Sequence, residues 1–233
     1  TGAVISETEP CTDGGTATVS IDTGSLSEQE FVLALQDGVI PSGVAITTAF
    51  DNCLESEAGL LDGSVTLVIE QLDLEGELGV DTFSMVFSAI FEDFTSEEGS
   101  IDGDISLSAV SSPGQTNVDV SGDSLAVGID GEALTLVDYV VDTFEDTTAL
   151  IENFDFTLQV SGLGEITVDT LEAWRTLAFA ETPISGVLRI VGLDGGSILV
   201  TALDEVNVQL EVDEDGDGTV DVTIMTTWDE LED

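Results

Sequence analysis

The residues best placed to do chemistry in this chain are the aspartates of one short run, residues 212–221. The run reads Val-Asp-Glu-Asp-Gly-Asp-Gly-Thr-Val-Asp. Counted from its first aspartate, carboxylates stand at positions 1, 3, 5 and 9 and a glycine at position 6, which is the ligand spacing of a calcium loop. Ca²⁺ prefers hard oxygen ligands, and the glycine permits a sharp turn. The sequence therefore predicts a calcium site formed by the side chains of Asp213, Asp215, Asp217 and Asp221 and the backbone carbonyl of Thr219.

The flanks of this acidic loop indicate which kind of calcium site to expect. Position 12, where an EF-hand has a bidentate glutamate, is Ile224. Apolar and polar residues alternate on both sides of the loop, so it connects strands rather than helices. The alternative is a solvated acidic turn, but four carboxylates within nine residues repel each other strongly without a cation. Glu214 could replace or supplement one ligand, and Mg²⁺ suits a flexible all-protein cage poorly.

Two other groups of aspartates are weaker candidates for cation sites. They are Asp102 with Asp104, and Asp119 with Asp123 and Asp130. Close aspartates arise by chance in a chain with 49 acidic residues, so neither group has a specific ligand pattern.

The composition argues against catalysis. The chain has no histidine and no lysine, which excludes a Ser-His-Asp triad, an ordinary zinc site, a Schiff base and a phosphate-loop lysine. Two carboxylates can hydrolyse a glycoside, but no pair stands out among so many. Sugar-stacking aromatics are few, and Trp174 and Trp228 are expected to be core or sheet residues. We expect a protein that is not an enzyme.

The charge limits the partners and the surroundings of the protein. With two arginines against 49 acidic residues, the formal net charge is −47, yet 42% of the residues are apolar, so a core can form. The charges repel each other unless cations screen or bind them, so we expect a medium rich in salt or calcium. Nucleic acid and anionic membranes are poor partners because both require basic patches.

The two cysteines predict an exported protein. Cys11 and Cys53 are expected to form a disulfide whose loop of about 43 residues would stabilise the fold by roughly 4 kcal/mol, with two buried free thiols as the alternative. The start at Thr1 without methionine fits a mature product whose signal peptide has been removed. No apolar run approaches the length of a membrane span, so no membrane insertion is expected. We expect an extracellular or cell-surface location.

Period-2 alternation of apolar residues predicts an all-β fold of antiparallel hairpins, arranged as a sandwich or as a curled or open barrel. A capping box at Ser27 and Glu30, followed by a closing glycine at Gly38, favours one short helix near residues 27–37, although a strand fits there too. Residues 171–179 are similarly ambiguous. A weak repeat begins at residues 50, 91 and 144, and each copy is interpreted as strand, acidic turn, strand, which is a hairpin, with chance similarity of turns as the alternative. Turns are predicted at Asp13-Gly14-Gly15, Asp62-Gly63, Asp102-Gly103, Pro113-Gly114, Asp130-Gly131 and Asp194-Gly195-Gly196.

The domain organisation is expected to be simple. Residues 11–233 have no linker and an even spread of charge, so they are interpreted as a single β domain. Residues 1–10 precede the first cysteine and could dock on a neighbouring subunit as a strand, with a frayed terminus as the alternative.

Three short patterns resemble a group of largely uncharacterised secreted or envelope β proteins of Gram-negative bacteria. They are the acidic loop followed by a strand ending in Thr226-Thr227-Trp228, the start at Cys11-Thr12-Asp13-Gly14-Gly15, and the element Phe50-Asp51-Asn52-Cys53. The resemblance implies export, β structure and calcium, and it brings no known activity with it.

Two functions remain open from the sequence. The first is a calcium-stabilised extracellular structural protein, a self-assembling surface or filament subunit or an adhesin, that associates through its strand edges. The second is an envelope binding module that carries an apolar ligand in a curled sheet. Phenylalanines would line its cavity, notably Phe83, Phe87, Phe91, Phe94, Phe154 and Phe156, although such residues more often fill a β core.

Overall fold

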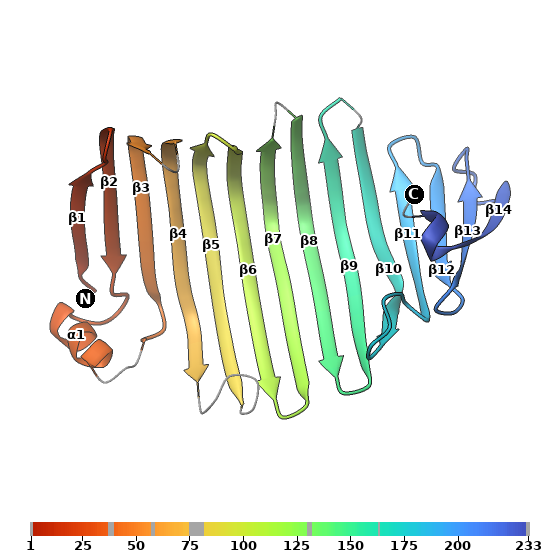
Figure 1. Ribbon diagram of the computed structural model, residues 1–233, viewed down its shortest axis with the longest axis horizontal. Helices are drawn as coiled ribbons and strands as arrows, with labels where there is room; N and C mark the ends of the chain where they lie inside the picture. The colour runs from red at the N-terminus through yellow and green to blue at the C-terminus, as the bar shows by residue number, and fades with distance from the viewer. Residues whose placement is uncertain are drawn as a thin grey trace.

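Fourteen antiparallel strands follow one another in chain order and form a single open sheet (Figure 1). The computed structural model describes residues 2–36, 40–56, 59–74, 82–129, 132–162 and 164–231. The all-β hairpin fold is confirmed, and every described strand belongs to this one sheet, so no second sheet completes a sandwich. β1 and β14 are the two edges, at opposite ends of the long axis.

The central strands are long and the edge strands are short. The strand bounds are β1 Val4–Pro10, β2 Gly14–Asp22, β3 Val44–Glu55, β4 Gly59–Leu74, β5 Phe83–Ser96, β6 Gly99–Ser112, β7 Gln115–Ile129, β8 Glu132–Asp146, β9 Ala149–Val160, β10 Gly164–Leu177, β11 Ser185–Gly192, β12 Ser197–Ala202, β13 Asn207–Asp213 and β14 Val222–Thr227. Residues 171–177, which the sequence left open, are therefore strand. Within the N-terminal segment that was expected to precede the domain, residues 4–10 form β1, which pairs with β2.

Two helices lie at opposite ends of the sheet (Figure 1). The predicted helix is α1, Glu28–Gln36. Its capping box forms as expected: the Ser27 amide donates to Glu30 Oε2 at 2.9 Å, and the Glu30 amide donates to Ser27 Oγ at 3.4 Å. The closing glycine, Gly38, lies outside the described residues. The second helix, α2, Trp228–Leu231, is a single turn. Neither helix is long and apolar enough to cross a membrane.

The pairing register separates the side chains into two faces. Neighbouring residues of a strand point to opposite faces, and residues paired across strands share a face. One row of paired residues, across β3 to β9, is apolar throughout: Val44, Ile69, Phe87, Leu107, Val120, Val141 and Phe154. The adjacent row on the other side is mostly polar: Ser88, Ser106, Ser121, Val140, Asp155, Asp169 and Arg189. We call these sides the apolar face and the polar face.

Well-buried side chains occur at both ends of the sheet and at a few positions of its central strands, such as Ala109 and Tyr139. At the C-terminal end, Trp174 packs in a cluster with Val200, Ala202 and Val208, and its ring centroid lies 5.4 Å from that of Trp228 in α2. The expectation that both tryptophans are core or sheet residues is confirmed. At the N-terminal end, Phe31 of α1 is 5% exposed. Over the central strands most apolar side chains are only partly buried by their neighbours.

Two predicted turns are instead β-bulges, which explains why the central strands are longer than the turn signals suggested. Asp62-Gly63 lies inside β4 and Asp102-Gly103 inside β6. Each lies opposite a strand residue with positive φ, Asn52 in β3 and Asp93 in β5, and the aspartate Oδ1 accepts that residue's amide. Asn and Asp tolerate this conformation, so the strand bends and continues rather than reversing. The first two copies of the weak repeat are hairpins, β3 with β4 and β5 with β6, and these bulges lie within them.

Other predicted turns are in place. Residues 13–15 lie at the β1–β2 connection, Pro113-Gly114 separates β6 from β7, and Asp194-Gly195 separates β11 from β12. The third repeat copy contains a true turn between β8 and β9, where Asp146 Oδ1 accepts the amides of Thr148 and Ala149. Asp130-Gly131 lies outside the described residues.

The predicted disulfide is confirmed. Cys11 and Cys53 are bonded across 42 positions of the chain, with their Cα atoms 5.4 Å apart. The bond ties the β1–β2 connection to β3, and Glu55 supports the same corner by accepting the amide and hydroxyl of Thr12. It therefore anchors the first edge strand, which is otherwise held by β2 alone.

Gly63→Ala is expected to destabilise the fold. Gly63 has φ +91°, and a Cβ there would lie 2.3 Å from the Asp93 carbonyl oxygen in the neighbouring bulge. Strain of this kind costs about 1–3 kcal/mol. Urea unfolding measures the loss. Gly192→Ala is the matched control, because a Cβ there meets only Gly196 O at an ordinary 3.7 Å. Equal stability of the two variants would contradict the bulge.

Candidate metal centre

The acidic loop lies at the far edge of the sheet, between β13 and β14. The two strands pair from Asn207↔Thr227 to Val212↔Val222, and the Asp221 amide closes the loop by donating to the Val212 carbonyl at 2.8 Å. The neighbouring β11–β12 turn packs against it, since a Cβ on Gly216 would lie 2.7 Å from Gly195 O. The loop thus connects strands, as its alternating flanks predicted.

Three of the four predicted carboxylates converge. Asp213, Asp215 and Asp221 each offer a carboxylate oxygen, and these oxygens all lie within 4.8 Å of one another. Ca²⁺ binds oxygens at roughly 2.3–2.6 Å, so ligands of one ion stand no more than about 5 Å apart. The three aspartates therefore have the spacing that one calcium ion requires. Asp213 is the most enclosed of them, at 9% exposure.

Backbone amides hold these carboxylates in place. Asp213 Oδ1 accepts the Gly216 amide at 2.8 Å, and its Oδ2 accepts the Gly218 amide at 2.9 Å. The Glu214 amide donates to Asp221 Oδ2 at 2.8 Å. An ionised carboxylate has about four lone-pair sites, so each group keeps acceptor capacity for a cation. The loop geometry is thereby set by the chain's own hydrogen bonds.

The remaining predicted ligands lie outside the converging group. Asp217 Oδ1 accepts the Thr219 amide at 2.7 Å, and neither residue belongs to the group of three. The Glu214 side chain is exposed. Asp217 and Thr219 would have to move or bind through water to join the site, so their ligand roles stay predictions.

The weaker candidate clusters have other roles in the described residues. Asp102 accepts the Asp93 amide, and Asp104 accepts the amides of Asp123 and Ser124, so both carboxylates satisfy backbone groups at bulges. Asp119 lies on β7, on the polar face, and Asp130 lies outside the described residues. A further group, Cys11 with Cys53 and Glu55, is excluded as a metal site because its sulfurs form the disulfide.

The register brings two pairs of aspartates together on the polar face, which linear spacing did not reveal. Asp119 lies directly opposite Asp142, and Asp155 lies opposite Asp169. Burial raises the pKa of Asp142, and the nearby charge of Asp119 raises it further. These residues are far apart in sequence, so only strand pairing brings them together.

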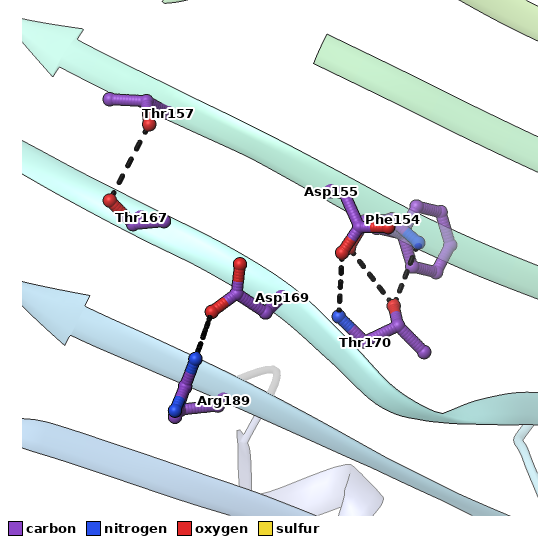
Figure 2. Close-up of polar contacts among 7 residues, drawn as sticks. All are labelled: Phe154, Asp155, Thr157, Thr167, Asp169, Thr170 and Arg189. Atoms are coloured by element: carbon purple, nitrogen blue, oxygen red, sulfur yellow. Dashed lines mark hydrogen bonds and ion pairs between the residues drawn. The ribbon is translucent and has the colours of Figure 1, made fainter. Parts of the chain in front are cut away.

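Arg189 offsets part of the negative charge of the second pair, Asp155 and Asp169. Arg189 Nη2 lies 2.6 Å from Asp169 Oδ2, the one ion pair among the described residues (Figure 2). The figure also shows how polar groups on β9 and β10 pair beside it: Thr157 with Thr167 at 3.4 Å, and Asp155 Oδ1 with the Thr170 amide at 3.1 Å. The ion pair is partly exposed, so it contributes modestly to stability.

Asp213→Asn/Asp215→Asn is expected to abolish a calcium-binding heat that the native chain shows. Both changes remove charge from the converging carboxylates while keeping the side-chain size. Isothermal titration of chelator-stripped protein measures the difference. Glu205→Gln, an exposed charge in the β12–β13 turn at the other end of β13, is the control and should bind like the native chain. Equal heats from all three proteins would exclude the site.

Asp142→Asn is expected to stabilise the fold at pH 7 by less than about 1 kcal/mol. A carboxyl whose pKa is raised on folding binds its proton more tightly in the folded state. It therefore opposes folding at any pH above its ordinary pKa, and its cost fades as the pH falls through the raised pKa. The stabilisation should thus vanish near pH 3, measured by urea unfolding at both pH values.

The matched control for this prediction is Asp169→Asn. It removes a carboxylate from the same face but also breaks the ion pair with Arg189, so it should not stabilise the protein. A gain equal to that of Asp142→Asn would show that the effect reflects net charge rather than the opposed pair.

Comparison of the chain with protein-family models, curated proteins and solved structures found no match in any of the three. Its function must therefore be inferred from its own geometry.

Proposed function

We propose that this chain is a non-enzymatic, calcium-stabilised extracellular structural protein that self-assembles through its strand edges into a filament or surface layer. The observation that carries the proposal is the open fourteen-strand sheet, in which β1 and β14 each have a pairing partner on one side only among the described residues. An edge strand presents a row of unpaired amides and carbonyls, which is a template for pairing with another chain.

The two edges suit head-to-tail association. β14 reads Val-Thr-Ile-Met-Thr-Thr and has no charged residue to guard it. β1 carries exposed Glu7 and Glu9. Their charges must be screened by cations, but they do not block the outward amides and carbonyls of β1 from pairing with another strand. Pairing β14 of one copy with β1 of the next would continue the same sheet. Such a heterologous contact is open-ended, so it produces a fibre rather than a closed ring unless the rotation closes.

Calcium would act on this assembly through the β13–β14 hairpin. The converging carboxylates of Asp213, Asp215 and Asp221 lie immediately before β14 in the chain. A bound ion would neutralise their repulsion and hold the last strand in register with β13. In a chain with a net charge of −47, it would also reduce repulsion between copies. Calcium would therefore stabilise the fold and one assembly edge together.

The proposed extracellular location and the proposed lack of catalysis rest on the disulfide, the composition and the open sheet. The disulfide is compatible with an oxidising compartment, and the absence of lysine and histidine removes the usual catalytic groups. The paired carboxylates of the polar face lie on an open sheet, where water is not excluded from a reacting group. A structural role outside the cell fits these features better than catalysis does.

A second candidate is an envelope module that binds an apolar ligand. It is favoured by a hollow of about 250 Å³ whose lining includes Leu67, Ile69, Leu72, Met85 and Phe87 of the apolar face. Phe87 was among the phenylalanines expected to line a cavity. Native mass spectrometry of freshly purified protein would show a lipid-sized bound mass if this role were correct.

Ser6→Pro is expected to abolish filaments while leaving the monomer folded. The Thr23 amide donates to the Ala3 carbonyl, and inward amides alternate along an antiparallel strand, so the Ser6 amide points away from β2. Proline removes this outward donor without removing a β1–β2 bond. Negative-stain electron microscopy in calcium-containing buffer measures assembly, with a chelated sample beside it.

Ser6→Ala is the control for the edge variant. Both changes remove the 2.9 Å hydroxyl contact with Ser20, but alanine keeps the outward amide. Filaments should persist with alanine and disappear with proline. Monodisperse native protein in calcium-replete buffer would contradict edge assembly.

A further inference from the structure

The apolar face is too large and too little covered for a chain that stays alone. The accessible surface of the chain is 13784 Å², whereas a compact monomer of 24.3 kDa exposes about 10,000 Å². The excess of about 3,800 Å² reflects the single-layer sheet, because α1 and α2 lie only at its two ends (Figure 1). A sheet with an apolar face is stable when another layer covers that face.

The layer that covers the apolar face must pack against a surface that has no charged side chain in its paired rows over β4 to β7. Paired rows on the apolar face run through β4 to β7 without a carboxylate, as in Leu67–Ala89–Ile105 and Ile69–Phe87–Leu107–Val120. Acidic residues of the same strands lie on the polar face, including Glu92, Asp104 and Asp119. The net charge is thus displaced from the apolar face, and bringing two apolar faces together leaves those carboxylates in water.

We propose that the apolar face of β4 to β10 packs against the same face of a second copy, so that two chains form a two-layer β-sandwich. Aligned sheets pack about 10 Å apart with their side chains interdigitated. This contact uses the face of the sheet and does not depend on pairing between β1 and β14.

Surface area favours a second copy as the occupant. An obligate dimer interface buries about 2,000–5,000 Å² in total, or roughly 1,000–2,500 Å² from each partner. The excess surface of one chain, about 3,800 Å², is larger than the area that each partner of such a dimer buries, so the fold need not rearrange. A copy of the same chain also has the same sheet dimensions and twist, so the two layers can align over many strands.

The charge distribution of the chain disfavours a basic protein or an anionic membrane as the layer that covers the apolar face. A basic partner would be drawn to the acidic polar face rather than to the uncharged one. An anionic membrane binds proteins through lysines and arginines, and this chain has only two arginines, of which Arg189 is on the polar face, paired with Asp169. A second copy requires no opposite charge over β4 to β7, because its apolar face brings no carboxylates into that part of the contact.

Leu107→Glu tests the contact in the full chain. Leu107 lies in the middle strands of the sheet, paired with Phe87 and Val120, so a carboxylate there would be buried without a partner. Light scattering after size exclusion is done in chelator and about 0.5 M salt, so that calcium-dependent edge assembly does not add to the mass. It should give twice 24.3 kDa for the native chain and 24.3 kDa for this variant. Circular dichroism should show that the variant keeps its strands.

Ser106→Glu is the matched control. It adds the same charge one residue away, but on the polar face between Ser88 and Ser121, so the dimer should persist. The edge variant Ser6→Pro should also remain dimeric, which separates failure of the face contact from failure of edge assembly. Loss of the dimer in Ser6→Pro but not in Leu107→Glu would overturn the proposal.

The two methionines provide a second test without a mutation. Met85 lies on the apolar face, paired with Leu72 and Ala109, whereas Met225 lies on the polar face of β14 and is 60% exposed. Peroxide oxidation, followed by mass spectrometry, should therefore be slow at Met85 and fast at Met225 in the dimer. Dilution below the dissociation constant should accelerate oxidation of Met85 alone, at least several-fold.

Two outcomes would reject the face-to-face dimer. One is a native chain that stays at 24.3 kDa when its concentration is raised 100-fold, with a Met85 oxidation rate that does not depend on concentration. The other is a monomer carrying a bound lipid-sized mass, which would assign the apolar face to a ligand instead. Slow, concentration-dependent oxidation of Met85 in a native dimer would support the proposal even if Leu107→Glu failed to fold.

Discussion

The structure depends on one constraint: side chains alternate between the two faces of a single-layer sheet, and over β4 to β7 the paired acidic residues lie on one of them. Because 49 carboxylates face only two arginines, charge cannot be neutralised within the chain. It is instead separated from the apolar residues by the thickness of the backbone. The strands then gain stability from lateral contacts on the apolar face, while water and cations screen the polar face.

This arrangement explains where the sheet needs support. Its centre is a continuous antiparallel meander with apolar rows, and its ends rely on local devices. The Cys11–Cys53 disulfide and α1 support the first strands. The cluster of Trp174 with Trp228, together with the acidic loop, supports the last ones. The open edges and the uncovered face are two separate surfaces for association, and a fibre of paired sheets would use both.

The bulges show how the same sequence signal can give different structures. Asp-Gly pairs at residues 62–63 and 102–103 resemble hairpin turns, yet each lies within a long strand opposite a residue with positive φ. The Asp-Gly pair supplies an acceptor and a close backbone approach, and the neighbouring strand supplies the extra residue. Turn and bulge have the same local chemistry, so only the neighbouring strand decides between them.

The sequence by itself determined what depends on near neighbours along the chain. Alternation set the strands and their two faces, the Ser27–Glu30 spacing set the helix start, and the Asp213–Asp221 spacing brought three of four predicted carboxylates together. Tertiary structure decided what depends on register. It made the sheet single and open, and it placed Asp119 opposite Asp142, which are 23 residues apart. The physical reason is that a strand's partners are fixed by pairing over the whole sheet, which no local spacing encodes.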